Sequence, residues 1–277
     1  MSTPTAQLLR RRLAAIAAGA AAAALLATAS PAAAQGRAPA SSPGAARAVS
    51  GGTWGTAREV PGTAALNQTG FAQVNSVSCT SPGNCTAGGE YDDSSGHIQA
   101  FVATQANGIW RKAKEVPGIA TLNTSGSATI AAVSCASAGN CSADGSYDVG
   151  PGFHQGQVFV ANEVNGTWGK AKEIPGTAAL NAGGNAGVAW VSCASAGNCS
   201  ADGSYTDGSG HQQVFVANEV NGTWGKATEI PGTAALNTGG FAGMGAVSCA
   251  PAGKCSAGGF YNPRGTTTLQ AFVVSQN

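Results

Sequence analysis

Beyond its first 50 residues, the chain consists of short apolar runs of strand length, separated by turns rich in Gly, Asn and Asp. This pattern predicts an all-β fold. A representative stretch contains the runs 187–193 (GVAWVSC), 199–205 (CSADGSY), 213–219 (QVFVANE) and 224–230 (WGKATEI). Asn-Gly at 221–222 joins the last two runs, as a tight hairpin requires. No helical apolar period of useful length interrupts the strands.

The third run of this stretch is apolar on both faces. Val214 and Val216 point one way, while Phe215 and Ala217 point the other. A strand with one solvent-exposed face would alternate apolar and polar residues. This strand does not, so both faces are expected to be buried, which requires neighbouring sheets above and below. We therefore expect several small sheets packed face to face.

A repeat dominates the sequence. Four copies open with Gly-x-Trp at Gly52, Gly108, Gly166 and Gly222, which lie 56, 58 and 56 residues apart. Each copy then carries Glu-Val/Ile-Pro-Gly, Leu-Asn, Val-Ser-Cys, a second Cys and Gln-x-Phe-Val or a close variant. Such a period indicates a solenoid, propeller or array of repeats. The likeness is internal to one chain, so it shows duplication and shared geometry.

The repeat predicts a four-bladed β-propeller, in which radial four-stranded sheets each pack between two others. The first copy begins with a fourth strand at 54–60, and the last copy ends after its third strand at 270–274. Pairing of this N-terminal strand with the C-terminal blade would close the ring. The alternatives are another all-β repeat and four separate disulfide-stapled domains, although such small domains rarely bury an adequate core.

Eight cysteines form four identical C-x5-C units. Eight cysteines allow 105 pairings, but the repeat and the short spacing favour four local disulfides across hairpin turns. Zinc is the alternative, and no His or second Cys pair recurs beside them at ligand spacing. The expected pairs are Cys79–Cys85, Cys135–Cys141, Cys193–Cys199 and Cys249–Cys255.

The N-terminus predicts export. Residues 1–34 read as a signal peptide with a basic start, an Ala-rich apolar segment and an Ala-Ala-Ala cleavage site, by either the Sec or the Tat route. Residues 35–51 read as a flexible linker, and 52–277 as the repeat domain. We expect a secreted, extracellular monomer without a membrane anchor after cleavage. The compartment outside the cell is oxidising, so disulfides persist there.

Composition narrows the possible partners. Only 10% of the 277 residues are charged and the formal net charge is +1, so nothing favours nucleic acid, which requires clustered Lys and Arg. No nucleophile turn, phosphate-binding loop or dinucleotide fingerprint is present. The recurring Glu59, Glu115, Glu173 and Glu229 lie on the predicted outermost strands, where a structural or solvated role is expected. We therefore expect no catalytic residues.

The propeller does predict a ligand face, opposite the cysteine hairpins. Asn in a turn more often satisfies its own backbone than a ligand, but the loops still gather polar side chains at this end. Trp190 is the one tryptophan outside the repeat pattern; it is expected to plug the axis, with sugar stacking as the alternative. No cofactor is expected except Ca²⁺ on the hairpin acids. The loop candidates are Asn67, Asn123, Asn181, Asn237, Asp92, Asp93, His97, Asp148, His154, Asp207 and His211.

The runs VSCASAGNCSADGSY (133–147 and 191–205) and QVFVANEVNGTW resemble the cysteine-hairpin repeats of secreted actinobacterial proteins. That resemblance covers about 52–277 and implies a propeller-like fold of uncharacterised function. The NGTW turn also resembles the Asp-box of sialidase-type propellers. Glu163 and Glu219 fall where its Asp would be, and Ala replaces its Ser. Neither resemblance supplies catalytic residues.

Taken together, the sequence predicts a secreted non-enzymatic propeller that binds or scaffolds an extracellular glycan or protein through its loop face. The first alternative is an extracellular glycoside hydrolase or lyase of the sialidase-like propeller type, which requires paired carboxylates in a pocket. The second is a structural protein of the cell envelope.

Overall fold

The computed structural model describes residues 52–150, 155–264 and 268–277. The chain divides into two units, Met1–Gly55 and Thr56–Asn277, and the second contains every strand described here. The predicted signal peptide, the predicted linker and His154 lie outside the described residues. No described helix is long and apolar enough to cross a membrane.

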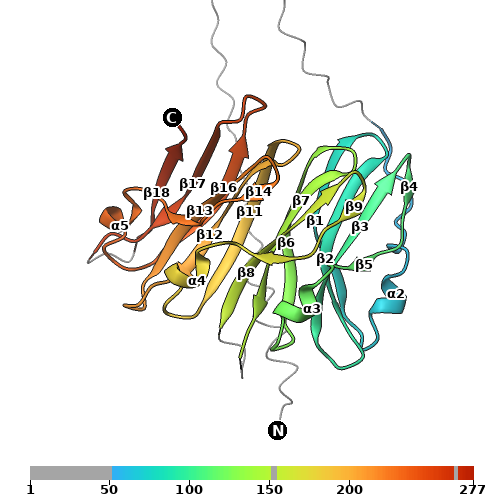
Figure 1. Cartoon of the computed structure of the whole chain (residues 1–277), viewed down its shortest axis with the longest axis horizontal. Coiled ribbons are helices and arrows are strands. Elements are labelled where there is room, and N and C mark those ends of the chain that lie inside the picture. The colour runs from blue at the N-terminus through green and yellow to red at the C-terminus, as the bar shows by residue number, and fades with distance from the viewer. Residues whose placement is uncertain (1–51, 151–154, 265–267) are drawn as a thin grey trace, which may run out of the picture. The chain divides into compact units, whose positions relative to one another are not determined.

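The fold is all-β, as predicted, and consists of four antiparallel sheets (Figure 1). The first sheet contains β1 (Ala72–Ser81), β2 (Asn84–Asp92), β3 (Ile98–Ala106), β4 (Ile109–Trp110) and β5 (Lys114–Glu115). The second contains β6 (Ala128–Ser137), β7 (Asn140–Asp148), β8 (Gly156–Val164), β9 (Thr167–Trp168) and β10 (Lys172–Glu173). Each of these sheets takes its first three strands from one repeat and its two short outer strands from the start of the next.

The remaining two sheets follow the same plan, but the last is shorter. The third contains β11 (Ala186–Ser195), β12 (Asn198–Thr206), β13 (Gln212–Val220), β14 (Thr223–Trp224) and β15 (Thr228–Glu229). The last has three strands, β16 (Ala242–Cys249), β17 (Cys255–Tyr261) and β18 (Gln270–Ser275). One helical turn precedes the first strand of each sheet: α2 (Thr63–Leu66), α3 (Ile119–Leu122), α4 (Thr177–Leu180) and α5 (Thr233–Leu236).

The turns form where the sequence places them. Asn221 and Gly222 both have positive φ, 50° and 80°, which is the backbone of a two-residue hairpin turn. The predicted fourth strand, in contrast, is interrupted between β14 and β15. The interruption occurs because the Ala227 N–H donates to the Pro175 carbonyl of the preceding connector, at 2.7 Å, instead of continuing the ladder.

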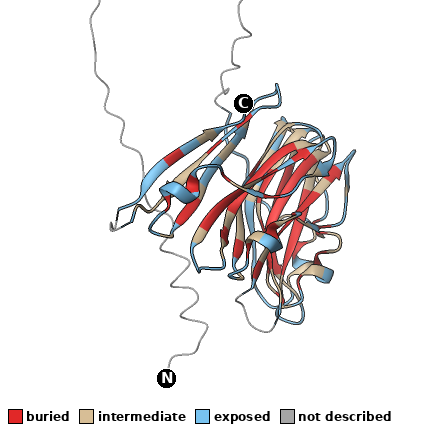
Figure 2. Ribbon diagram, turned by 60° about the vertical axis from the view of Figure 1, so that its left-hand side comes forward, coloured by how far each residue is buried: buried red, intermediate tan, exposed pale blue. Residues whose placement is uncertain are grey.

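The sheets pack in chain order through their first strands, with β1 against β6, β6 against β11, and β11 against β16. Phe101, Phe159 and Phe215 occupy the same place on successive third strands and are fully buried. Figure 2 shows the buried residues concentrated on the facing sheets, and the last sheet mostly exposed at its edge. The predicted burial of the third strand on both faces is therefore correct.

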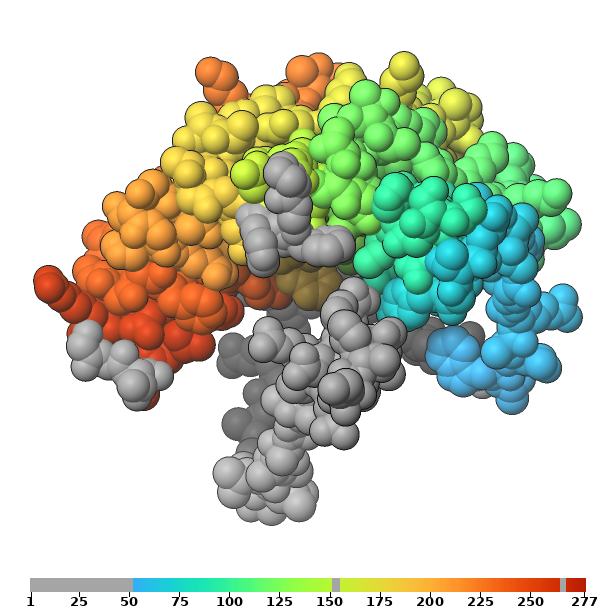
Figure 3. All heavy atoms as spheres, turned by 90° about the horizontal axis from the view of Figure 1, so that it is seen from below, coloured from blue at the N-terminus to red at the C-terminus, as the bar shows by residue number. Residues whose placement is uncertain are grey.

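The described residues do not form a closed ring. The last sheet pairs only β16, β17 and β18, and residues 54–60 form no strand. Figure 3 shows the first sheet and the last sheet at opposite ends of the row. The propeller-like packing is observed, whereas the count of four blades and the ring closure stay predictions.

Candidate functional site

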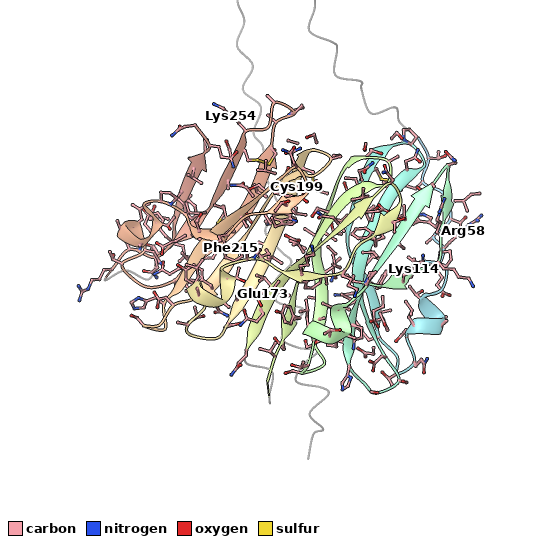
Figure 4. The ribbon with its side chains drawn as sticks, in the orientation of Figure 1. Arg58, Lys114, Glu173, Cys199, Phe215 and Lys254 are labelled. Carbon is pink, nitrogen blue, oxygen red and sulfur yellow. A yellow bond between two sulfur atoms is a disulfide. The ribbon has the colours of Figure 1, made fainter. Side chains whose placement is uncertain are left out.

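The cysteine hairpins match the prediction. Disulfides join Cys79 to Cys85, Cys135 to Cys141, Cys193 to Cys199 and Cys249 to Cys255. Each closes the turn between the first two strands of its sheet. Figure 4 shows Cys199 and Lys254 towards this end of the sheets, away from the helical turns. Four disulfides fit an oxidising compartment such as the extracellular space.

The predicted ligand face does bring its Asn residues and hairpin tips to one end of the sheets, but the Asn side chains bond within the protein. Nδ2 of Asn123 donates to the Ile98 carbonyl and to Oε1 of Gln99, both at 3.1 Å, while its Oδ1 accepts the Ser127 N–H at 2.7 Å. Asn181 and Asn237 are buried in equivalent networks. Asn67 is half-buried and accepts the Gly70 N–H.

The hairpin acids are also engaged locally. Oδ1 of Asp207 accepts the N–H groups of Ser209 and His211, at 2.8 and 3.0 Å, and Gln213 donates to Oδ2. Asp93 makes the same bonds in the first sheet, His97 taking the place of His211. Asp92 and Asp148 are also bonded. The described residues contain no group of three or more His, Cys, Asp or Glu placed to hold a metal ion. The ligand face and Ca²⁺ therefore stay predictions.

Trp190 lies on β11 with 49% of its surface exposed. Its backbone N–H donates to Oδ1 of Asp202 at 3.1 Å, beside the bulge where β11 gains a residue against β12. Asp144 caps the equivalent bulge of β6 by accepting the Ala132 N–H. The first and last sheets have Gly88 and Gly258 at this position. The structural role of Asp144 and Asp202 was not predicted from the sequence.

The two capping carboxyls are fully buried and titrate abnormally. Loss of hydration raises the pKa of Asp202 to about 7. Burial also raises the pKa of Asp144 well above its usual range, and the charge of Asp202 adds to the shift. Oδ2 of each carboxyl has no hydrogen-bond partner among the described residues. Both side chains lie inside sheet packing, away from the surface cavities described next.

Two further glutamates, Glu163 on β8 and Glu219 on β13, border one cavity. This cavity has a volume of ≈ 230 Å³ and lies between the second and third sheets, at the cysteine-hairpin end. The two residues are only 2% and 3% exposed. They are the residues at the Asp position of the Asp-box-like turn, which was the sequence signal that could have singled them out.

Each of these carboxylates accepts a bond from the preceding sheet. Thr104 donates to Oε1 of Glu163 at 2.9 Å, and the Asn162 side-chain amide donates to Oε1 of Glu219. Oε2 of Glu163 is buried without a partner among the described residues. Burial raises the pKa of both groups; the Thr104 bond and the positive charge of Arg111 oppose the rise at Glu163, and the Asn162 bond opposes it at Glu219.

Glu163 also borders a second cavity, of ≈ 450 Å³, between the first and second sheets. Arg111, Lys112, Lys114 and Trp168 line that cavity with it. The indole N–H of Trp168 donates to the Thr104 hydroxyl at 3.4 Å. Glu163 thus borders two cavities: the larger is also lined by an aromatic ring and cations, and the smaller by a second glutamate.

The recurring outer-strand glutamates have the structural role that the sequence predicted. The Tyr91 hydroxyl donates to Oε2 of Glu115, and Tyr205 donates to Glu229, both at 2.8 Å. Tyr147 and Glu173 make the same bond at 3.2 Å. Each bond fastens the outermost strand to the second strand of the same sheet.

No protein-family model matches the chain, and no curated protein matches its sequence. Three similar solved structures are a Hadza microbial sialidase, an α-L-arabinofuranosidase from Podospora anserina and a subtype N11 neuraminidase-like protein of a flat-faced bat isolate. Their TM-scores are 0.43, 0.39 and 0.40, and their identities 10%, 11% and 14%. The alignments cover 73%, 74% and 74% of this chain, and 44%, 72% and 55% of the respective structures. The chain thus spans less than half of the sialidase.

These comparisons contradict the prediction of a non-enzymatic binding module, because two of the three proteins are named as glycan-cleaving enzymes and the third as neuraminidase-like. The structure also weakens the basis of that prediction, because the side chains of the predicted ligand-face Asn residues form hydrogen bonds within the protein. TM-scores of this size support no transfer of activity. Any assignment of activity has to come from the residues of this chain.

Proposed function

We propose that the chain is an extracellular glycoside hydrolase that uses Glu163 and Glu219 as its carboxylate pair. The observation that carries the proposal is that these two buried glutamates border one cavity. Glycoside hydrolysis generally needs two carboxyl groups, one to protonate the leaving oxygen and one to attack or to activate water. No other residue type has to be assumed for this chemistry.

The environments of the two groups differ in a way that assigns their roles. Arg111 favours the charged form of Glu163, so the proposal assigns Glu163 as the base or nucleophile. Burial raises the pKa of Glu219 and no cation opposes the rise, so the proposal assigns Glu219 as the general acid. The four disulfides support action outside the cell.

The cavities on either side of Glu163 support a substrate that extends across it. Trp168 offers an aromatic face for a sugar ring in the larger cavity. Arg111, Lys112 and Lys114 favour a sugar that carries a negative charge there. Glu163 borders both cavities and Glu219 borders the smaller one, so the proposal puts the scissile bond beside Glu163.

The test is turnover of a panel of fluorogenic glycosides, neutral and acidic, by the wild type and by two variants. Glu163→Gln and Glu219→Gln should each lower kcat/KM by about 10²–10⁴-fold, the usual contribution of a positioned acid or base. Glu219→Gln should also remove the basic limb of the pH–rate profile. Glu115→Gln is the matched control, because that carboxylate holds Tyr91 on an outer strand and should leave turnover unchanged. No turnover of any glycoside, or equal activity of all three variants, would refute the proposal.

A further inference from the structure

Consecutive sheets are joined by a hydrogen bond that always runs in one direction. The Ser hydroxyl of the Val-Ser-Cys motif accepts the backbone N–H of the first Cys in the next sheet, at 3.0 Å in each case. The acceptor belongs to the earlier sheet and the donor to the later one. The pairs are Ser78 with Cys135, Ser134 with Cys193, and Ser192 with Cys249.

This direction gives every sheet two different faces. We use "trailing face" for the face that receives the following sheet, and "leading face" for the face that packs on the preceding sheet. At the two ends of the row, no sheet among the described residues lies against one face of each kind. These are the leading face of the first sheet, which includes Cys79, and the trailing face of the last sheet, which includes Ser248.

The polar groups at the two ends are complementary. The Cα atoms of Cys79 and Cys85 are 4.0 Å apart, the short spacing of a pair without mutual ladder bonds, so the Cys79 N–H points away from β2. Among the described residues, no side chain accepts that N–H and none donates to Ser248. The same donor and acceptor are paired at all three internal contacts.

The apolar groups at the two ends are complementary as well. Val133 and Val191 are 7% and 8% exposed on the leading faces of the second and third sheets, whereas the equivalent Val77 is 55% exposed. Val102 and Val160 are 2% exposed on trailing faces, whereas the equivalent Val273 is 88% exposed. The valines at these positions are thus most exposed at the two ends of the row.

The edge strands at the two ends are complementary too. The last sheet has no outer strand among the described residues, and the segment before the first sheet matches the sequence of one. In each of the first three sheets a two-residue outer strand pairs with the third strand, but β18 has no such partner among the described residues. The missing strand has a sequence counterpart, because Arg58-Glu59 precedes Val-Pro-Gly as Lys114-Glu115 does. Among the described residues, Tyr261, the counterpart of Tyr91, has no carboxylate partner, and Glu59 is the one recurring glutamate without a Tyr partner; its Oε1 accepts bonds from Thr63 and Ala64.

We propose that the trailing face of the last sheet binds the leading face of the first sheet of a second copy of this chain. Ser248 of one copy accepts the Cys79 N–H of the other. Val273 of the first copy and Val77 of the second are both buried at this contact. Residues 58–59 of the second copy complete the sheet beside β18, with Glu59 opposite Phe272, as Glu229 lies opposite Phe215. The same chain does not supply this partner, because its first and last sheets stand at opposite ends of the row (Figures 3 and 4).

A head-to-tail contact has a characteristic complementation test. Val77→Asp blocks the leading end and Val273→Asp blocks the trailing end, and both side chains are too exposed to disturb the fold. By light scattering after size exclusion, the wild type should be larger than one chain, and each variant alone should have the mass of one chain. An equimolar mixture of the two variants should form a pair, because one leading face and one trailing face remain intact. Ile109→Asp, at an exposed apolar position on β4, is the control and should associate like the wild type.

A photo-crosslinker at position 273 gives an independent measurement in a mixture of ¹⁵N-labelled and unlabelled chains. The proposal expects mixed-isotope links between position 273 and the peptide containing Val77. Links within one chain would overturn it in favour of the ring closed by its own N-terminal strand. A wild type of one-chain mass at every concentration would overturn it too, and so would association that Val273→Asp abolishes and Val77→Asp leaves intact.

Discussion

The backbone N–H of Cys193 donates to the hydroxyl of Ser134 across the boundary between two sheets, at 3.0 Å. The motif that carries the disulfide therefore also joins its sheet to the preceding one. The disulfide closes the hairpin within a sheet, and the adjacent Ser sets the spacing to the next sheet. This relationship explains why Val-Ser-Cys recurs as a unit in every repeat.

Ser134→Ala should lower the free energy of unfolding by about 1 kcal/mol, because it leaves the half-buried Cys193 N–H without its acceptor. Urea denaturation followed by circular dichroism would measure the change. Ser94→Ala, in an exposed hairpin tip, is the control and should leave the midpoint where it is. Equal midpoints for both variants would show that the bond contributes nothing to stability.

Asp202 should make the protein less stable as the pH rises from about 4 to about 7. Its pKa is raised to about 7, so the folded protein retains a proton that the unfolded chain releases above about pH 4. Asp202→Asn keeps an acceptor for the Trp190 N–H and removes the titration. The free energy of unfolding of the variant should therefore rise relative to that of the wild type through this pH range, by about 1.4 kcal/mol for each unit of pKa shift.

Urea titrations at a series of pH values would measure that difference. Asp207→Asn is a control of opposite sign. Burial at Asp207 is outweighed by hydrogen bonds from His211, Gln213 and Ser209, which lower its pKa. As the pH rises through the acid range, the free energy of unfolding of the wild type should increase relative to that of Asp207→Asn. Parallel stability curves for wild type and Asp202→Asn would contradict the assignment.

Gly203→Ala should be strongly destabilising, because an added Cβ would lie 2.2 Å from the Gly187 carbonyl oxygen and 2.8 Å from the Phe215 ring. Overpacking of this kind costs about 1–3 kcal/mol or more, and here the obstacle is backbone. Gly187→Ala, on the neighbouring strand, is the matched control, because its Cβ would meet only the Ser146 hydroxyl at 3.7 Å. Thermal unfolding of the two variants should differ clearly, and similar melting temperatures would show that the strands separate easily.

Asn237→Ala should cost about 1–3 kcal/mol, because it removes the partner of the Gln212 carbonyl, of Gln213 and of the Asn262 N–H from a buried site. Asn67→Ala, at the equivalent half-buried position of the first sheet, should cost less because, within the part of the chain that the structure describes, the Asn67 side chain makes one bond, from the Gly70 N–H. Chemical denaturation distinguishes the two. If both variants unfold like the wild type, these side-chain bonds do not stabilise the fold, and the predicted ligand-binding role of the Asn residues would be favoured instead.

The strands, hairpins and disulfides were predictable because they depend on local patterns. Asn221-Gly222 fixes its turn by backbone conformation alone, and the spacing of Cys193 and Cys199 allows a bond across one hairpin. The break between β14 and β15 was not predictable, because it depends on Pro175 in the connector that precedes the third sheet. Local sequence carries no signal for such a contact.

The candidate site was predictable only in part, for the same reason. Asn123 was correctly placed at the loop end of the sheets, but its bonds to Ile98 and Gln99 depend on distant residues. Glu163 and Glu219 are 56 residues apart, and only the packing of neighbouring sheets brings them to one cavity. Burial of Asp144 likewise follows from the sheet that covers it.

The one-way bond between Ser and Cys also bears on how such a chain changes over evolutionary time. Every junction uses the same acceptor and the same donor, so a duplicated unit inserted at any junction finds both partners ready. Stability of such an array is approximately a sum of contributions from single units and nearest-neighbour contacts. The length of the array is therefore free to vary by whole units, while the chemistry of each junction stays the same.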